Sequence, residues 1–167
     1  MKKIVIGFSM LLGMLIADDI VWQKDLDSAL ELAKKENRLL MVMVEGEHCR
    51  WCKKMRYRTL SNDAVVAKLK PFVNIRVMQE DKAVMKELPK IQGVPTIFFM
   101  YPDKEVIETA VGYFNVADFL SFFVSVDRKV RQKNRTSSFH QINKNRNICI
   151  KCPVMAIRTV HHRILQK

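Results

Sequence analysis

Apolar and polar residues follow one another along the chain in two rhythms, one typical of helices and one typical of strands. Apolar residues three and four positions apart predict helices at 25–36, from Cys49 or Arg50 to Leu60, from Ser61 or Asn62 to Leu69, at 81–88 and at 116–129. Continuous or alternating apolar runs predict strands at 38–44, 72–78, 96–100 and 105–110, the last two joined by a turn. Strands that alternate with helices indicate an α/β fold, and the hairpin makes its sheet mixed.

The periodic pattern ends near residue 130, and this divides the chain into three parts. We expect a signal segment at 1–17, a folded domain at 18–130 and a basic tail of low order at 131–167. The stretch from Arg131 to Asn147 is rich in Arg, Lys, Asn, Gln and Ser and has no sustained apolar periodicity, which predicts disorder there.

The first 17 residues have the composition of a secretory signal. Lys2 and Lys3 precede an apolar run of 14 residues that ends at Ala17. This run is short for a membrane-spanning helix, which needs about 20 apolar residues. We therefore predict cleavage after Ala17 and a periplasmic or otherwise exported domain, where disulfide chemistry is permitted. An uncleaved segment would instead anchor the domain to a membrane.

The net charge of +12 is concentrated at the end of the chain. Residues 18–127 carry 16 Lys and Arg against 17 Asp and Glu, whereas residues 128–167 carry 11 Lys and Arg and no acidic residue. The central part is therefore nearly neutral, and a basic surface over the whole protein is not implied. The charge of the tail is suited to binding an anionic lipid surface, or the tail is dispensable. Phe139 is its single aromatic residue, so aromatic residues do not interleave with the basic ones and no nucleic-acid partner is expected.

The four cysteines form two close pairs, Cys49–Cys52 and Cys149–Cys152, and such pairs indicate redox or metal chemistry. The first pair follows a predicted strand and a short loop and opens a helix. Cysteines three residues apart on a helix lie on one face and can form a disulfide. The first of them sits where unpaired N–H groups favour a thiolate.

Other interpretations of the cysteines stay open. The first pair can form half of a zinc site, although His48 is the only further ligand of that soft type in the core, or it can be a structural disulfide. The second pair lacks a preceding strand, so it is an incidental pair in the tail or a weak metal site with His161 and His162.

A second motif, Gly93-Val94-Pro95-Thr96, precedes a buried strand. A cis bond between Val94 and Pro95 would explain a proline at this position, because X–Pro is the only common cis site. Such a turn could lie beside the cysteine pair and present the backbone of Val94 to a substrate chain. An ordinary trans proline that starts a strand is the alternative.

Together the two motifs resemble the thioredoxin superfamily over residues 20–128. The run Cys-Arg-Trp-Cys-Lys-Lys-Met and the opening Trp22 look most like exported bacterial thioredoxin-like proteins. The resemblance implies a central mixed β-sheet flanked by helices. It also implies that Cys49 is the nucleophile, that Cys52 is the resolving thiol and that Pro95 is a cis-proline.

The sequence departs from thioredoxin around the cysteines. Arg50 and Trp51 replace Gly-Pro between them, His48 replaces a Trp, and Met43 stands where thioredoxin has a buried Asp. We expect Trp51, Val94 and Pro95 to bind substrate. His48 and Arg50 would tune the thiol pKa, because a neighbouring positive charge favours the thiolate.

The function expected from this resemblance is thiol–disulfide exchange with protein substrates outside the cytoplasm. The habit of the family favours the reductase direction. Alternatives are a disulfide oxidant or isomerase, and a non-catalytic protein that binds copper or a partner. No cofactor beyond the Cys49–Cys52 disulfide and no metal is expected. We expect a monomer that exchanges electrons with a membrane or periplasmic redox partner.

Overall fold

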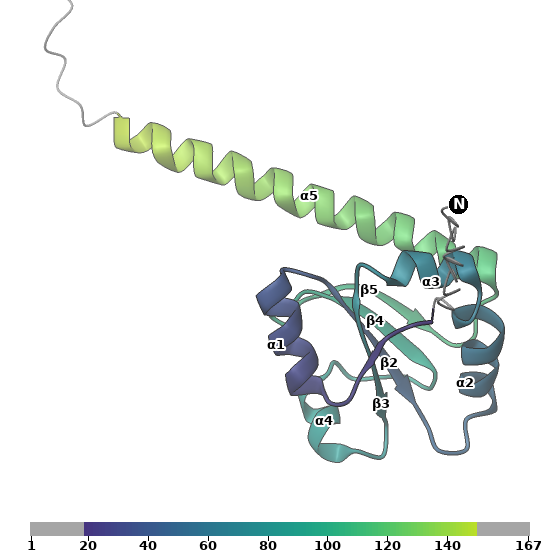
Figure 1. Cartoon of the computed structure of the whole chain (residues 1–167). Coiled ribbons are helices and arrows are strands. Elements are labelled where there is room, and N and C mark those ends of the chain that lie inside the picture. The colour runs from purple at the N-terminus through teal and green to yellow at the C-terminus, as the bar shows by residue number, and fades with distance from the viewer. Residues whose placement is uncertain (1–18, 150–167) are drawn as a thin grey trace, which may run out of the picture. The chain divides into compact units, whose positions relative to one another are not determined.

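The computed structural model describes residues 19–149, which form a mixed sheet flanked by helices (Figure 1). The elements in chain order are β1 (Trp22–Gln23), α1 (Leu26–Glu36), β2 (Leu40–Glu45), α2 (Arg50–Met55), the π-helix η1 (Arg56–Leu60), α3 (Asp63–Leu69), β3 (Val73–Met78), α4 (Lys82–Glu87), β4 (Thr96–Met100), β5 (Val106–Val111) and α5 (Val116–Cys149). The predicted fold class, an α/β thioredoxin-like fold with a central mixed sheet, is confirmed.

The sheet has five strands in the order β1-β3-β2-β4-β5. Strands β1, β3 and β2 run parallel, while β4 pairs antiparallel with both β2 and β5. Antiparallel pairing sets Val44 opposite Thr96, so the end of β2 lies beside the start of β4. This pairing brings the loop that leads to the cysteines next to the loop that holds Pro95.

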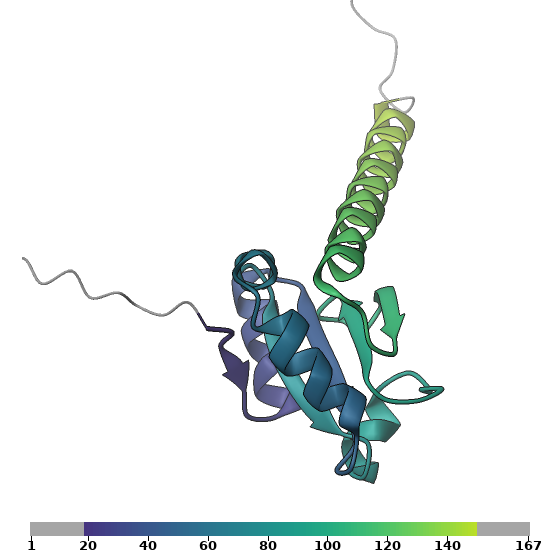
Figure 2. The ribbon, with the colours of Figure 1, turned by 90° about the vertical axis from the view of Figure 1, so that its right-hand side faces the viewer.

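The core fills both faces of the sheet. All six residues of β2 are buried, which explains the continuous apolar run in the sequence. Residues of α1 such as Leu30 and Ala33 pack with Val42 on one face. On the other, Phe99 lies within ring-contact distance of Phe119. Figures 1 and 2 both show the sheet between α1 and α2.

Short polar side chains set the helix ends. Asp25 accepts a hydrogen bond from the backbone N–H of Ser28 at 2.7 Å and begins α1, and Asn37 ends it with a left-handed backbone (φ 52°). Asn62 caps α3 through the N–H of Ala64 at 3.1 Å. The first of these hydrogen bonds, from the Ser28 backbone, lowers the pKa of Asp25 below 3.8.

The end of the described chain corrects one prediction. The closing helix was expected to stop near Lys129 and to give way to disorder from Arg131 to Asn147, but α5 continues to Cys149. Arg, Lys and Gln are good helix formers, and neither Gly nor Pro interrupts 116–149, so this stretch can be helical without an apolar stripe. The two-residue strand β1 was also missed, because it is too short to show alternation.

The chain divides into two compact units inside α5, the first ending at Phe123 and the second beginning at Val124. Within residues 19–149, no helix is both long and apolar enough to cross a membrane. The predicted signal segment at 1–17 lies outside the described residues, as do Cys152, His161 and His162.

Candidate active site

Cys49 and Cys52 are joined by a disulfide at the start of α2, with 5.2 Å between their Cα atoms. Strand β2 ends at Glu45, and a tight turn follows in which the N–H of Cys49 donates to the carbonyl of Gly46 at 3.1 Å. Cys49 is the N-cap of α2, and its Sγ accepts a hydrogen bond from the N–H of Cys52 at 3.0 Å. The chain therefore places one sulfur at the positive end of a helix.

The two cysteines differ sharply in accessibility. Cys49 is half-buried, whereas the side chain of Cys52 is only 1% exposed. An incoming disulfide can therefore reach the first sulfur but not the second. Such an arrangement can attack a substrate through one thiol and close internally through the other.

The residues around the pair carry exposed positive charge. Arg50 and Lys54 lie on α2, with the Arg50 guanidinium carbon 5.4 Å from the centre of the Trp51 ring. His48 is exposed in the loop before Cys49. Positive groups near a cysteine stabilise its thiolate once the disulfide is reduced.

The loop before Cys49 is tied to the loop after β3. The carboxylate of Glu80 accepts a hydrogen bond from the backbone N–H of Glu47 at 3.2 Å. Hydrogen bonds from the backbone of Glu80 itself and of Glu47 lower the pKa of the Glu80 carboxyl, with a smaller contribution from the charge of His48. This contact holds the loop that positions Cys49. It could not be predicted from the sequence, because Glu80 lies in a turn that belongs to no motif.

An aromatic surface lies beside the disulfide. The Trp51 side chain is 46% exposed, and its ring centre is 5.8 Å from that of Tyr113, which follows β5. The Lys54 ammonium lies 4.9 Å from the Trp51 ring centre and 4.4 Å from that of Tyr113. We call Trp51, Lys54 and Tyr113 the aromatic shelf. Trp51 was expected here from the sequence, whereas Tyr113 was not, because it belongs to no motif.

The loop that holds Pro95 contacts the loop before the cysteines. The Val94–Pro95 peptide bond is cis, Pro95 is buried and Val94 is half-buried. The carbonyl of Pro95 accepts a hydrogen bond from the N–H of Gly112 at 2.7 Å. A Cβ atom added to Gly46 would lie 3.3 Å from Cγ2 of Val94, so these two loops touch.

One buried acidic residue near the site was not expected. Met43, at the position of thioredoxin's buried Asp, is fully buried in β2, but Glu45 at the end of the same strand is buried too. Its Oε2 lies 3.4 Å from Nε of Arg56, and its Oε1 lies 3.9 Å from Nη1 of Arg76. The strand predicted at 38–44 stops one residue before Glu45, so the burial of this residue was not expected.

Metal binding has no candidate cluster in the described part of the chain. Residues 19–149 contain no group of three or more His, Cys, Asp or Glu side chains placed to hold an ion. A zinc site built on Cys49 and Cys52 would need about four ligands.

The fold and the site can be compared with known proteins. A thioredoxin-like domain family matches residues 26–126. A solved thioredoxin from Thermus thermophilus is similar with a TM-score of 0.51 and 29% sequence identity, over 60% of this chain and 82% of that chain. The DsbH oxidoreductase is similar in fold, with a TM-score of 0.52 and 19% identity over 65% of this chain and 84% of that chain.

Comparison with curated proteins gave no match. The family match nevertheless spans more than half of the chain, and it includes the strand β2, the Cys49–Cys52 pair and the Pro95 loop. The chain therefore belongs to the thioredoxin-like domain family and is a thiol–disulfide oxidoreductase.

Proposed function

We propose that the protein reduces disulfides of other proteins outside the cytoplasm, with Cys49 as the attacking thiol. The observation that carries this proposal is the difference between an accessible Cys49 at a helix start and a Cys52 that is 1% exposed. The reductase direction is supported by similarity to a thioredoxin. The location is supported by the apolar run behind Lys2 and Lys3, and an uncleaved run would leave the domain membrane-anchored.

The reaction begins from the reduced dithiol. The Cys49 thiolate attacks one sulfur of the substrate disulfide and releases the other as a thiolate, which takes up a proton. The Cys52 thiol then loses its proton and attacks Sγ of Cys49, which releases the second substrate thiol. Two electrons pass to the substrate, and the Cys49–Cys52 disulfide remains until a dithiol partner of the membrane or periplasm reduces it. No further cofactor is required.

The surroundings of the disulfide suit an extended substrate chain. Val94 and Pro95 would offer backbone atoms to the substrate segment that carries the target disulfide. Trp51, on the aromatic shelf, would cover the adjoining apolar side chains, since exposed aromatic patches mark interaction sites. His48 and Arg50 would favour the Cys49 thiolate and so the reduced form.

The test is reduction of insulin by the mature chain with dithiothreitol as the electron source. We expect wild-type protein to accelerate insulin precipitation and Cys49→Ser to abolish this activity. Cys52→Ser should accumulate mixed disulfides, which mass spectrometry detects. The matched control is Cys149→Ser, which should keep full activity. Activity retained by Cys49→Ser would contradict the proposal.

A glutathione titration of the Cys49–Cys52 couple decides the direction. A reduction potential near that of thioredoxin, about −270 mV, supports a reductase, and a value near about −120 mV identifies an oxidant instead. Stoichiometric binding of Cu(I) with little turnover would identify a metal carrier.

A further inference from the structure

An ion pair with a buried carboxylate spans the two ends of the cysteine segment. Glu45 is the last residue of β2, before Cys49, and Arg56 is the first residue of η1, after Cys52. The Glu45 side chain is 7% exposed and that of Arg56 is 30% exposed. Because removing a carboxylate from water is costly, a buried Glu needs a nearby cation. The pair therefore links the strand that precedes the disulfide to the helix that follows it.

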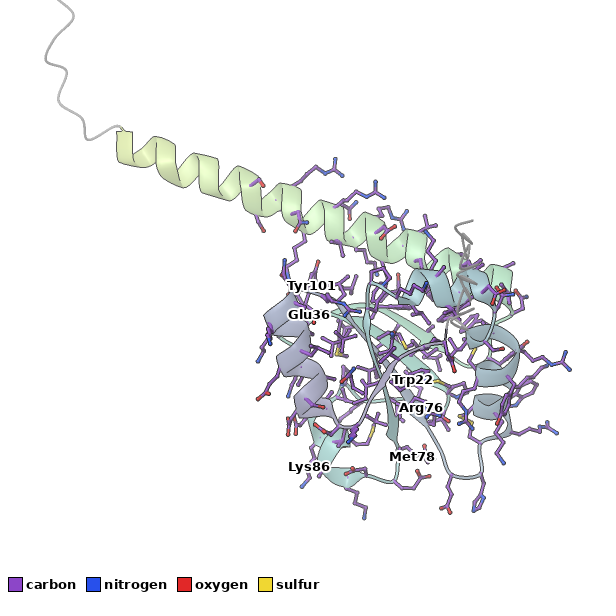
Figure 3. The ribbon with its side chains drawn as sticks, in the orientation of Figure 1. Trp22, Glu36, Arg76, Met78, Lys86 and Tyr101 are labelled. Atoms are coloured by element: carbon purple, nitrogen blue, oxygen red, sulfur yellow. A yellow bond between two sulfur atoms is a disulfide. The ribbon has the colours of Figure 1, made fainter. Side chains whose placement is uncertain are left out.

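In the part of the chain that the structure describes, one atom on each side of the pair lacks an ordinary hydrogen bond. Within the described residues, neither Oε1 of Glu45 nor Nε of Arg56 has a hydrogen-bond partner, although both atoms are buried. Arg76 is the second cation near Glu45, and its guanidinium carbon lies 5.0 Å from the Trp22 ring centre. Figure 3 labels Trp22 and Arg76 as neighbours. We therefore consider the effect of the Glu45 charge on the groups around it.

Cys49 shares a pocket with this ion pair. The pocket has a volume of about 420 Å³, and Glu45, Arg56, Arg76 and Cys49 all line it. The other charged residues that line it are Lys24, Glu47 and Lys53. Its wall therefore carries four cations against two carboxylates, of which Glu45 is the buried one. Charges that line one pocket act on each other more strongly than charges separated by bulk water.

We propose that the charge of Glu45 tunes the reactivity of Cys49. Its carboxylate offsets part of the positive charge that the Arg56 guanidinium brings to the wall of the pocket. Unopposed, that charge would favour the Cys49 thiolate and therefore the reduced dithiol. Glu45 thus keeps the thiolate less stable and the dithiol more reducing. This inference rests on the proposed function, because it assigns Cys49 as the attacking thiol.

The experiment is a double-mutant cycle of Glu45→Gln and Arg56→Gln in the full mature chain. The first readout is the pH midpoint of Cys49 alkylation by iodoacetamide in reduced protein, followed by peptide mass spectrometry. The second is the equilibrium constant of the Cys49–Cys52 couple with glutathione. Glu31→Gln is the matched control, because Glu31 is exposed on α1 and its substitution makes the same change in net charge.

We expect Glu45→Gln to lower the alkylation midpoint by about one pH unit, since one neighbouring charge is removed. The glutathione equilibrium should shift toward the dithiol by up to about tenfold, which corresponds to about 30 mV in the oxidising direction. Arg56→Gln should shift both readouts the opposite way. The double variant should return close to wild type, and Glu31→Gln should match wild type.

The proposal is wrong if folded Glu45→Gln has the same alkylation midpoint as Glu31→Gln. If Glu45→Gln does not fold, the comparison of Arg56→Gln with the double variant decides, and equal midpoints there overturn the proposal. Both readouts need no protein substrate. If wild-type protein does not reduce insulin but the variants show the expected midpoint shifts, the reductase function is rejected and the role of Glu45 stands.

Discussion

At the residue scale, the aromatic shelf is the part of the site that distinguishes this protein from a bare dithiol. Trp51 lies between the two cysteines in sequence, and Lys54 contacts both aromatic rings of the shelf. An ammonium above a ring adds an attraction of about 0.5–1 kcal/mol at exposed sites. This contact helps to hold the Trp51 ring, which is still 46% exposed and so accessible to a partner.

Trp51→Ala should weaken binding of protein substrates without impairing the dithiol. We expect kcat/KM for insulin to fall about threefold to tenfold, mainly through KM, because one exposed aromatic contact contributes about 1 kcal/mol. The rate with a small disulfide such as hydroxyethyl disulfide should stay within about twofold. Val21→Ala removes another exposed apolar side chain, outside the aromatic shelf, and is the control. An equal loss on both substrates would show that Trp51 acts on the cysteines instead.

How far single residues could be predicted depended on whether they belong to a local pattern. Cys49, Cys52 and Trp51 follow from the spacing of one short motif at a helix start. Tyr113 and Glu45 could not be found in this way, because long-range strand pairing and the pocket wall bring them to the site. Burial of a charge at the end of an apolar run is a tertiary property that no sequence period records.

At the element scale, side-chain caps fix where helices begin. Asp25 starts α1 and Asn62 starts α3, and each accepts a backbone N–H. Cys49 plays the same part for α2 with a sulfur atom. The helix that carries the disulfide therefore begins at the reactive residue itself.

The cap at Asp25 should make stability depend on pH. Because the Ser28 hydrogen bond lowers the folded pKa of Asp25 below its ordinary value, the contribution of Asp25 is present above the unfolded pKa and is lost as pH falls through the folded pKa. We expect Asp25→Ala to lower Tm at pH 7 and to differ less from wild type at pH 3. Asn62→Ala removes an uncharged cap, so thermal unfolding should show a Tm difference that does not change with pH. A constant Asp25→Ala difference would contradict this.

Elements were predictable where the apolar pattern was long and strong. The run that became β2 and the helical spacing that became α1 were found within a few residues. The end of α5 was not, because its last part is helical by intrinsic propensity and not by an apolar stripe. An apolar periodicity arises from a buried face, so it cannot predict a helix that buries few side chains.

At the scale of the whole molecule, the excess of basic residues and the residues assigned to the reaction lie in different parts of the chain. Every residue assigned to the reaction lies before residue 114, whereas the basic excess lies after residue 127. We expect a chain shortened after Val130 to reduce insulin at a rate within about twofold of the full mature chain. The same deletion should weaken binding to anionic vesicles, measured by cosedimentation. Complete loss of insulin reduction in the folded short chain would show that the tail takes part in the reaction.

The pairing of Val44 with Thr96 also matters while the protein is being made. During synthesis, Cys49 and Cys52 are added to the chain more than 40 residues before β4, the antiparallel neighbour of β2, is complete. Until then the emerging chain has two thiols but no sheet neighbour on that side and no proline loop. Its sulfurs are open to other thiols throughout this interval, so a chain that stays reduced until Thr96 has been made avoids wrong disulfides.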